Sequence, residues 1–174
     1  MWTLSGFVDE ISSDFTEQCR VASRLGLTHV ELRSAWDVNI LDLKPEQLTV
    51  MKDTLAEHDL QVSSIGSPIG KIGIREDFEP HLKRMRHAAE VASQLGAPYV
   101  RIFSFFTPEG EDPDIHRDEV LRRMRALADV ASSPWSRTWP TATPVVASPE
   151  PSSGPAPGRR SPTSSRPKGS SSHD

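Results

Sequence analysis

The sequence predicts an α/β fold with a parallel sheet, built from four strand–helix units within residues 1–131. Short runs rich in β-branched and aromatic residues alternate with stretches of helical periodicity. The runs recur about every thirty residues, a spacing that fits parallel strands joined by helical crossovers. The phrase VASRLGLTHVELRS at 21–34 returns as VASQLGAPYVRIFS at 91–104. We interpret this repeat as two equivalent connections, each from the end of a helix into the next strand, and call these connections joints. Chance similarity, the alternative for so short a repeat, leaves the architecture the same.

Four segments are expected to form the strands, and each is bounded by turn residues. They cover residues 2–8, 28–33, 61–67 and 99–105. Because a helical pattern follows each one, the connections are expected to be right-handed crossovers.

The first two helices have clear start signals. The first is expected to begin at Asp14, with Glu17 three residues later forming a capping box, and to end at Gly26 as a left-handed C-cap. Its buried face carries Phe15, Cys19, Ala22 and Leu25. The second helix has Pro45 in its first turn, and its buried face carries Leu48, Met51 and Leu55.

The third helix is expected to use Asp77 as N-cap, to accept Pro80 in its first turn and to end at Gly96. Its apolar face carries Leu82, Met85, Ala89 and Ala92. The fourth helix is expected to begin near Asp112-Pro113, and its apolar face carries Val120, Met124, Leu127 and Ala131.

The composition changes abruptly after Ala131. Residues 132–174 hold nine of the fifteen prolines and no Leu, Ile, Met or Phe, so they cannot bury enough apolar surface to offset their ordering entropy. They carry 5 basic against 2 acidic residues, whereas residues 1–131 carry 15 against 22. We therefore divide the chain into a folded part, 1–131, and a disordered Pro/Ser-rich tail, 132–174. Out-of-frame or non-homologous sequence is our interpretation of the tail, and a genuine disordered extension is the alternative.

Charge and cysteine content bear on partners and location. An acidic folded part gives no reason to expect a nucleic-acid partner. No run approaches the roughly 20 apolar residues of a membrane span, and the N-terminus lacks a basic region followed by an apolar stretch. The single cysteine, Cys19, is expected to be a small core residue and fits a reducing compartment. We expect a cytoplasmic protein without a membrane partner.

The number of units points to a particular α/β architecture. A full (β/α)₈ barrel needs eight units and about 250 residues. An open doubly wound sheet can be complete with fewer strands. However, its usual Gly-rich turn after the first strand is missing, since the chain there reads DEISSDF. The four units predicted here are half the number of a full barrel, and they leave a barrel fragment and an open sheet as the two alternatives.

Polar side chains occur where the strands end, which is where βα architectures bind ligands. Glu31 and Arg101 occupy equivalent places in the repeat with opposite charge. They can pair as a structural ion pair, hold a sugar hydroxyl, or do both. The other candidates at strand ends are Asp9, Glu10, Arg33, the loop Ser67–Lys71 and Ser104.

The loop SPIGKIGIR after the third strand combines a proline, two glycines and a cation. Gly70 and Gly73 permit close backbone approach, and Lys71 can neutralise a phosphate or a carboxylate. A solvated lysine on a tight loop is the alternative.

The sequence shows no convincing metal spacing. His81 and His87 are six residues apart on a helix, which places them on different faces. The acidic run EGEDPDIHRDE is interpreted as a solvated loop that starts the fourth helix.

Four phrases in order resemble the first half of the sugar phosphate isomerase/epimerase family, which has a xylose isomerase-like TIM barrel. They are GFVDEIS, HVELRSAWDVNILDL, SSIGSPIGKI and YVRIFSFF, and the likeness covers roughly residues 4–131. The resemblance implies a metal-dependent enzyme that moves a proton between neighbouring carbons of a sugar or polyol through an enediolate on a divalent ion (Mn, Mg or Zn). In the family, the metal ligands come from the second half of the barrel, and a phrase like HEN usually supplies the first. This sequence has no such phrase, so the resemblance implies an incomplete (half) TIM barrel.

The resemblance leads to two hypotheses of different class. In the first, the chain descends from an isomerase or epimerase, is truncated before the metal ligands and is inactive alone, with no metal of its own. Its substrate-binding residues are then Glu31, Ser67, Lys71, Arg101 and Ser104. In the second, it is a non-catalytic binding protein, a half barrel that forms a homodimer or aggregates through exposed strand edges. Nucleic-acid cleavage, as in related barrel endonucleases, is disfavoured by the acidic charge and the lack of clustered histidines.

Overall fold

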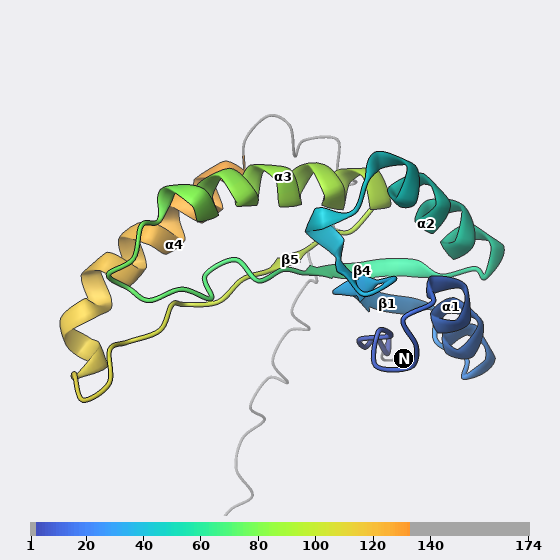
Figure 1. Ribbon diagram of the computed structural model, residues 1–174, viewed down its shortest axis with the longest axis horizontal. Coiled ribbons are helices and arrows are strands. Elements are labelled where there is room, and N and C mark those ends of the chain that lie inside the picture. The colour runs from blue at the N-terminus through green and yellow to red at the C-terminus, as the bar shows by residue number, and fades with distance from the viewer. Residues whose placement is uncertain (1–2, 133–174) are drawn as a thin grey trace, which may run out of the picture. The chain divides into compact units, whose positions relative to one another are not determined.

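A computed structural model of the chain describes residues 3–132 (Figure 1). Three parallel strands form its central sheet, in the order β1 (His29–Leu32), β4 (Gln61–Gly66) and β5 (Val100–Arg101). Four helices alternate with these strands: α1 (Phe15–Arg24), α2 (Pro45–Glu57), α3 (Glu79–Leu95) and α4 (Arg117–Ala131). The expected α/β class and partial barrel are confirmed, since the parallel strands of the described part form an open sheet. The tail expected over 132–174 lies, except for Ser132, outside the described residues.

Each helix packs against the next one along the chain, so α1, α2, α3 and α4 follow one another as the helices of successive barrel units do (Figure 1). A single hydrophobic cluster joins the helices to the strands. The strand residues in it are Val30, Leu32, Val62 and Ile65, and the helix residues include Phe15, Met51, Met85, Val91 and Leu127. None of the helices in the described part is long and apolar enough to cross a membrane.

The helix starts agree only in part with the sequence signals. The fourth helix, expected near Asp112-Pro113, begins at Arg117, because Pro113–His116 form a 3₁₀ turn instead. The Asp14 carboxylate accepts the N–H of Glu17 at 2.8 Å, as a capping residue should. The expected capping box is only half formed, because the Asp14 N–H donates to the Ser12 hydroxyl and the Glu17 carboxylate accepts from Arg20. For α3 the assignment of Asp77 as N-cap is off by one, because Phe78 holds that position. The Asp77 carboxylate still accepts the N–H of Glu79 at 3.1 Å, so it satisfies a free donor of the first turn.

The expectation that Leu25 is buried is wrong, since 69% of its surface is exposed. Leu25 follows the last helical residue and lies about 80° around the helix axis from Phe15, counting 100° per residue. No described residue covers that position.

The first expected strand, 2–8, is also wrong for the residues described. Only Phe7 makes a parallel bridge, to Glu31, and the N–H of Glu31 donates to the carbonyl of Gly6 at 2.9 Å. The residues before Gly6 are exposed, with Leu4 at 70%, so they lack the buried contacts that would hold a longer strand in place.

The last expected strand, 99–105, shortens to the two residues of β5 because the chain beyond Arg101 pairs with the loop after β4. The N–H of Phe103 donates to the Ile69 carbonyl and that of Phe106 to the Ile72 carbonyl, both at 2.8 Å. Gly70 makes this approach possible. Its φ is +85°, and a Cβ atom there would lie 2.0 Å from the Phe103 carbonyl oxygen.

Short elements that the sequence did not predict fill the connections. A hairpin of β2 (Ser34–Ala35) and β3 (Val38–Asn39) is followed by the 3₁₀ turn η1 (Ile40–Asp42), and a second 3₁₀ turn, η2 (Pro113–His116), precedes α4. The two hairpin turn residues, Trp36 and Asp37, have φ of 53° and 59°. This positive φ at both positions is typical of a tight type I′ turn.

Candidate functional site

The sheet face opposite the hydrophobic cluster carries the charged residues. Along β1, Val30 and Leu32 are buried in the core, so the alternation of strand side chains turns Glu31 and Arg33 to the other face. The register pairs Glu31 with Ser64 of β4, and Gly66 of β4 with Arg101 of β5. Because the middle strand presents only these small residues, long side chains from the two outer strands can meet above it.

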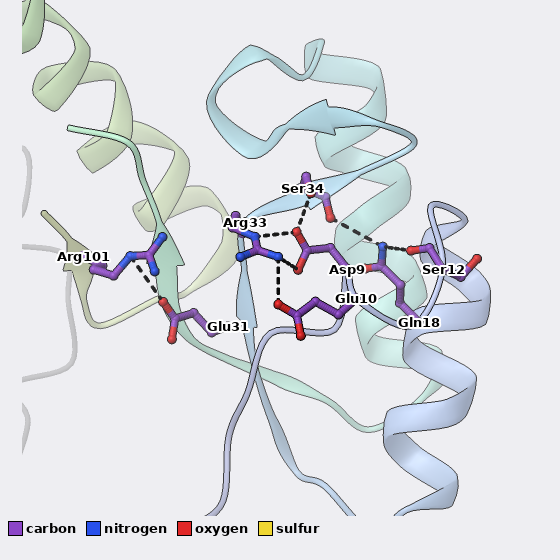
Figure 2. Close-up of polar contacts among 8 residues, drawn as sticks. All are labelled: Asp9, Glu10, Ser12, Gln18, Glu31, Arg33, Ser34 and Arg101. Atoms are coloured by element: carbon purple, nitrogen blue, oxygen red, sulfur yellow. Dashed lines mark hydrogen bonds and ion pairs between the residues drawn. The ribbon is translucent and has the colours of Figure 1, made fainter. Parts of the chain in front are cut away.

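Glu31 and Arg101 do meet there, as Figure 2 shows. The Arg101 Nε lies 3.8 Å from the Glu31 Oε1, with side chains 32% and 23% exposed. This distance allows an ion pair but is too long for a hydrogen bond. Both atoms are buried and neither has a hydrogen-bond partner in the described part of the chain. The pair therefore contains one donor and one acceptor without a hydrogen-bond partner in residues 3–132.

Two phenylalanine rings hold the cations of this face. The Arg101 guanidinium carbon lies 4.8 Å from the centre of the Phe7 ring and 5.0 Å from that of Phe103. Arg33 lies 4.7 Å from the Phe7 ring, and the Lys71 Nζ lies 4.6 Å from the Phe103 ring. Cation–π contacts of this kind position a guanidinium without using its N–H donors.

Gly66 makes room for this arrangement on the middle strand. A Cβ atom there would lie 2.9 Å from the Phe7 ring and 3.1 Å from the Arg33 Cβ. A side chain at position 66 would therefore displace the ring that supports two guanidinium groups.

Asp9 anchors Arg33 from the segment before α1 (Figure 2). Arg33 donates from Nε to Asp9 Oδ2 at 2.7 Å and from Nη2 to Oδ1 at 3.1 Å, and the Ser34 hydroxyl also donates to Oδ2. Burial raises the pKa of Asp9, but the hydrogen bonds from Arg33 and Ser34 together with the Arg33 charge outweigh it, so the pKa is lowered overall. Glu10 adds a longer contact to Arg33 Nη2 at 3.3 Å.

Gln18 is a supporting residue that the sequence analysis missed. It is fully buried in α1 and donates from Nε2 to the Ser12 carbonyl at 2.7 Å, with a longer contact to the Ser34 carbonyl at 3.5 Å. It thereby ties α1 to the segment that carries Asp9 (Figure 2). Glutamine side chains on helices are mostly exposed to solvent, so the helical periodicity of this segment did not predict that Gln18 is buried.

The remaining predicted residues differ in their surroundings. Ser67 is fully buried, and its hydroxyl donates to the Arg101 carbonyl at 2.6 Å and accepts the Ile69 N–H at 3.3 Å. Ser67 thus fixes the backbone of Arg101. Lys71 and Ser104 are exposed. The structure therefore groups Glu31, Arg101 and Lys71 around the rings of Phe7 and Phe103, with Ser67 beneath them.

The described residues do not fit a metal centre. Within 3–132 no group of three or more His, Cys, Asp or Glu side chains is arranged to hold a metal ion. The two carboxylates nearest the site, those of Asp9 and Glu31, face guanidinium groups. In residues 3–132 these carboxylates are therefore matched by guanidinium cations.

Parallel strands in chain order, covered by sequential helices and ending in charged side chains on the inner face, define a (β/α)-barrel type of protein. The family model described as xylose isomerase-like TIM barrel matches residues 19–134. The chain belongs to this family, and the resemblance seen in the sequence is confirmed.

Solved structures of this fold match the chain over about half of their own length. A xylose isomerase-like TIM barrel protein from Mycobacterium smegmatis in complex with magnesium has 23% identity and a TM-score of 0.58, with 76% of this chain and 52% of that one covered. An AP endonuclease, family 2, from Brucella melitensis has 19% identity and a TM-score of 0.54, covering 74% and 50%. D-allulose 3-epimerase from Methylomonas sp., in complex with D-allulose, has 21% identity and a TM-score of 0.51, covering 73% and 46%. A comparison with curated proteins found no match.

Proposed function

We propose that residues 1–131 are the N-terminal half of a xylose isomerase-like barrel and that the inner sheet face is the sugar-binding wall of an isomerase or epimerase. The observation that carries this proposal is the pair of buried, unpartnered atoms on Glu31 and Arg101, 3.8 Å apart. The family of the chain and the D-allulose held by the Methylomonas enzyme support a sugar or polyol as the ligand class.

A sugar hydroxyl suits this pair because it both donates and accepts hydrogen bonds. Both side chains are partly exposed, but the two atoms are buried, so the proposal includes a small side-chain shift on binding. The hydroxyl oxygen then accepts from the Arg101 Nε–H and donates to the Glu31 Oε1 at about 2.8 Å. Phe7 and Phe103 fix the guanidinium for this contact, so little side-chain entropy is lost on binding.

The other predicted residues take supporting roles in the proposal. Lys71 and Ser104, both exposed, contact the part of the ligand nearest solvent, and Lys71 favours a phosphate or another anionic substituent. Ser67 acts through the Arg101 backbone rather than by touching the ligand.

Catalysis by the complete barrel requires a divalent ion, Mg, Mn or Zn, to polarise the sugar carbonyl, and the M. smegmatis protein with magnesium supports this ion class. Residues 3–132 do not fit such an ion. We therefore propose that the chain is truncated relative to an active barrel, and that it binds sugar but does not isomerise it alone.

The division of the chain and its location are part of the proposal. The family match ends at residue 134, which supports a boundary between a barrel half at 1–131 and a non-homologous or out-of-frame tail at 132–174. Cys19 is fully buried, and burial, with Asp14 nearby, raises the pKa of its thiol to about 12. A buried thiol of this kind is structural, and the proposed cytoplasmic location is compatible with it.

Calorimetric titration of the full chain with D-allulose tests this function. Wild type is expected to bind saturably, and E31Q and R101Q are each expected to bind about tenfold more weakly, because each removes one charged partner of the bridging hydroxyl. The matched controls are E57Q at the end of α2 and R125Q in α4, both exposed. If E31Q and R101Q bind D-allulose with the wild-type affinity, the proposal is wrong.

Self-association is a second candidate function, favoured by the outer edge of β5. Within residues 3–132, β5 pairs only with β4. An apolar groove of about 400 Å³ lies beside that edge, and Tyr99 there is 65% exposed. The groove is lined by Met85, Ala89, Pro98, Tyr99, Val100, Ala131 and Ser132. A second copy of the chain is the proposed occupant, because its own strand edge can extend the sheet.

Sedimentation equilibrium distinguishes this candidate from the first. A self-associating half barrel is expected to form dimers that Y99D dissociates. A chain that remains monomeric at all concentrations contradicts self-association and leaves the sugar-binding proposal intact.

A further inference from the structure

An open groove of about 650 Å³ lies between the loop after β4 and the first turns of α3. Five of its lining side chains are basic or imidazole groups, and no Asp or Glu of residues 3–132 lines it. The lining residues are Pro68, Lys71, Pro80, His81, Lys83, Arg84 and His87. The lining of the groove is therefore positively charged, although residues 1–131 carry a net negative charge.

The cations of the groove are incompletely paired. Neither Lys71 nor Lys83 forms an ion pair with a carboxylate in the described part of the chain. The Arg84 Nη2 lies 2.9 and 2.8 Å from the two oxygens of Asp42 in η1, but its Nε is buried without a hydrogen-bond partner. Its side chain is 35% exposed, so part of Arg84 still faces solvent beside the groove.

His81 contributes a donor without needing a charge. Its Nδ1 accepts the Gly70 N–H at 3.0 Å, so the neutral ring carries its hydrogen on Nε2. Burial lowers the pKa of His81, the charges of Arg84 and Arg123 add to this, and Glu76 opposes it. The ring therefore stays neutral near pH 7 and keeps an N–H donor.

The two histidines of α3 both line this groove, although their spacing led us to expect different faces. The groove is open enough to span the roughly 120° that separates residues six apart on a helix. His87 is committed elsewhere, since its Nε2 lies 3.0 Å from the Leu41 carbonyl and its Nδ1 lies 3.6 Å from Glu90. The free donors of the groove are thus those of Lys71, Lys83, Arg84 and His81.

We propose that this groove binds the phosphate group of a small phosphate monoester, with Lys83, Arg84 and His81 as the anchoring donors. Several donors converging on one groove suit a tetrahedral dianion, which offers three acceptor oxygens. Pro68 and Pro80 give it rigid apolar walls. The site goes beyond the proposed sugar-binding face, since its anchors do not include Glu31 or Arg101.

Titration of the full chain at low ionic strength with glucose 6-phosphate, inorganic phosphate and glucose tests the site. Glucose 6-phosphate is expected to bind saturably and to weaken with added salt. K83Q and R84Q are each expected to weaken it several-fold and the double variant at least about tenfold. K52Q is the matched control, since Lys52 is an exposed lysine of α2 outside the groove. Lys83 is exposed, so its substitution leaves the fold intact.

The possible outcomes separate the phosphate sources. If inorganic phosphate binds as tightly as glucose 6-phosphate and K83Q weakens both, the anion site stands and free phosphate is a ligand. Equal binding of glucose and glucose 6-phosphate, or an affinity unchanged in the double variant, overturns it. The sugar-binding proposal fails separately, because E31Q affects D-allulose and K83Q affects phosphate.

Discussion

Two joints of this molecule share their sequence and their capping geometry, yet they lead to strands of different length. Gly26 after α1 and Gly96 after α3 have φ of 78° and 69°. In both joints the N–H of the residue after the glycine donates to the carbonyl five residues earlier, from Leu27 to Ala22 at 3.1 Å and from Ala97 to Ala92 at 2.9 Å. This is the hydrogen bond of a Schellman motif, so the echo between residues 21–34 and 91–104 reflects one capping chemistry used twice.

The two joints diverge after the shared part. β1 continues for four residues beside β4, whereas β5 stops after two. The residue equivalent to Arg33 is Phe103, whose backbone N–H bonds to the loop after β4 instead of a strand ladder. Local sequence therefore fixes how each helix ends, but the tertiary partner decides how far the next strand runs.

The equivalent positions of Glu31 and Arg101 in the two repeats explain why these side chains lie close together. Glu31 and Arg101 occupy the same position in the two copies and flank β4 from opposite sides. Because the equivalent residues carry opposite charges, a carboxylate and a guanidinium meet above Ser64 and Gly66.

The largest effect is expected from G70A, which disrupts the close contact between the loop after β4 and the chain that follows β5. Its Cβ atom would lie 2.0 Å from the Phe103 carbonyl oxygen at a φ of +85°. We expect a loss of about 3 kcal/mol in the free energy of unfolding, measured by urea denaturation. G110A is the control, because Gly110 has a φ of +78° and open space around its Cβ position. Equal losses in the two variants would show that the Phe103 contact does not matter.

The leucines before the two glycines should differ sharply. Leu95 is 8% exposed and Leu25 is 69% exposed. L95A is expected to cost about 2–3 kcal/mol, and L25A less than about 0.5 kcal/mol. The same urea titrations check both values, and similar costs would contradict the different burial of the two joints.

Asp9 holds Arg33, the residue that follows β1, whereas the equivalent residue after β5 is Phe103 and has no such carboxylate partner. Because the pKa of Asp9 is lowered in the folded state, its contribution to stability is present above the unfolded pKa of about 4 and is lost as pH falls through the folded pKa. D9N is expected to cost about 2 kcal/mol at pH 7.

The stability gap between wild type and D9N, measured by urea denaturation, should shrink below pH 4. D129N, an exposed substitution in α4, is the control and should leave stability nearly unchanged. A gap that stays constant from pH 7 to pH 3 would show that the Asp9 charge does not hold Arg33.

The glycines that end α1 and α3 should respond equally to substitution. Gly26 and Gly96 both have positive φ and open space around the Cβ position. G26A and G96A are each expected to cost about 1 kcal/mol, because an L-residue is strained in the left-handed region. Thermal melts of both variants check this, and a difference of several-fold would mean that the two caps are not equivalent.

The sequence predicted the elements that depend on local chemistry. Asp14, Pro45 and Gly96 marked helix ends because capping acts within a few residues. It failed for residues 3–8 and 102–105, where strand formation depends on a partner segment distant in the chain. The β2–β3 hairpin was missed because its turn uses Trp36 and Asp37 in a conformation that glycine or asparagine usually signals.

The site was predictable to a similar extent. Glu31 and Arg101 stood out because charged residues inside buried strands are unusual. The stacking of Arg101 between Phe7 and Phe103, and the basic groove beside α3, depend on side chains from separate elements. No spacing along one segment encodes them.

The most direct test of the account is an NMR titration of the ¹⁵N-labelled full chain with D-allulose. The account predicts that the amide signals of Glu31, Ser64 and Arg101, which line the inner face, shift together along one binding curve, while those of α2 stay in place. It also predicts that E31Q moves the same binding curve to about tenfold higher sugar concentration. No shifts at saturating sugar, or shifts confined to residues away from this face, would contradict the assignment of the inner sheet face as a sugar-binding wall.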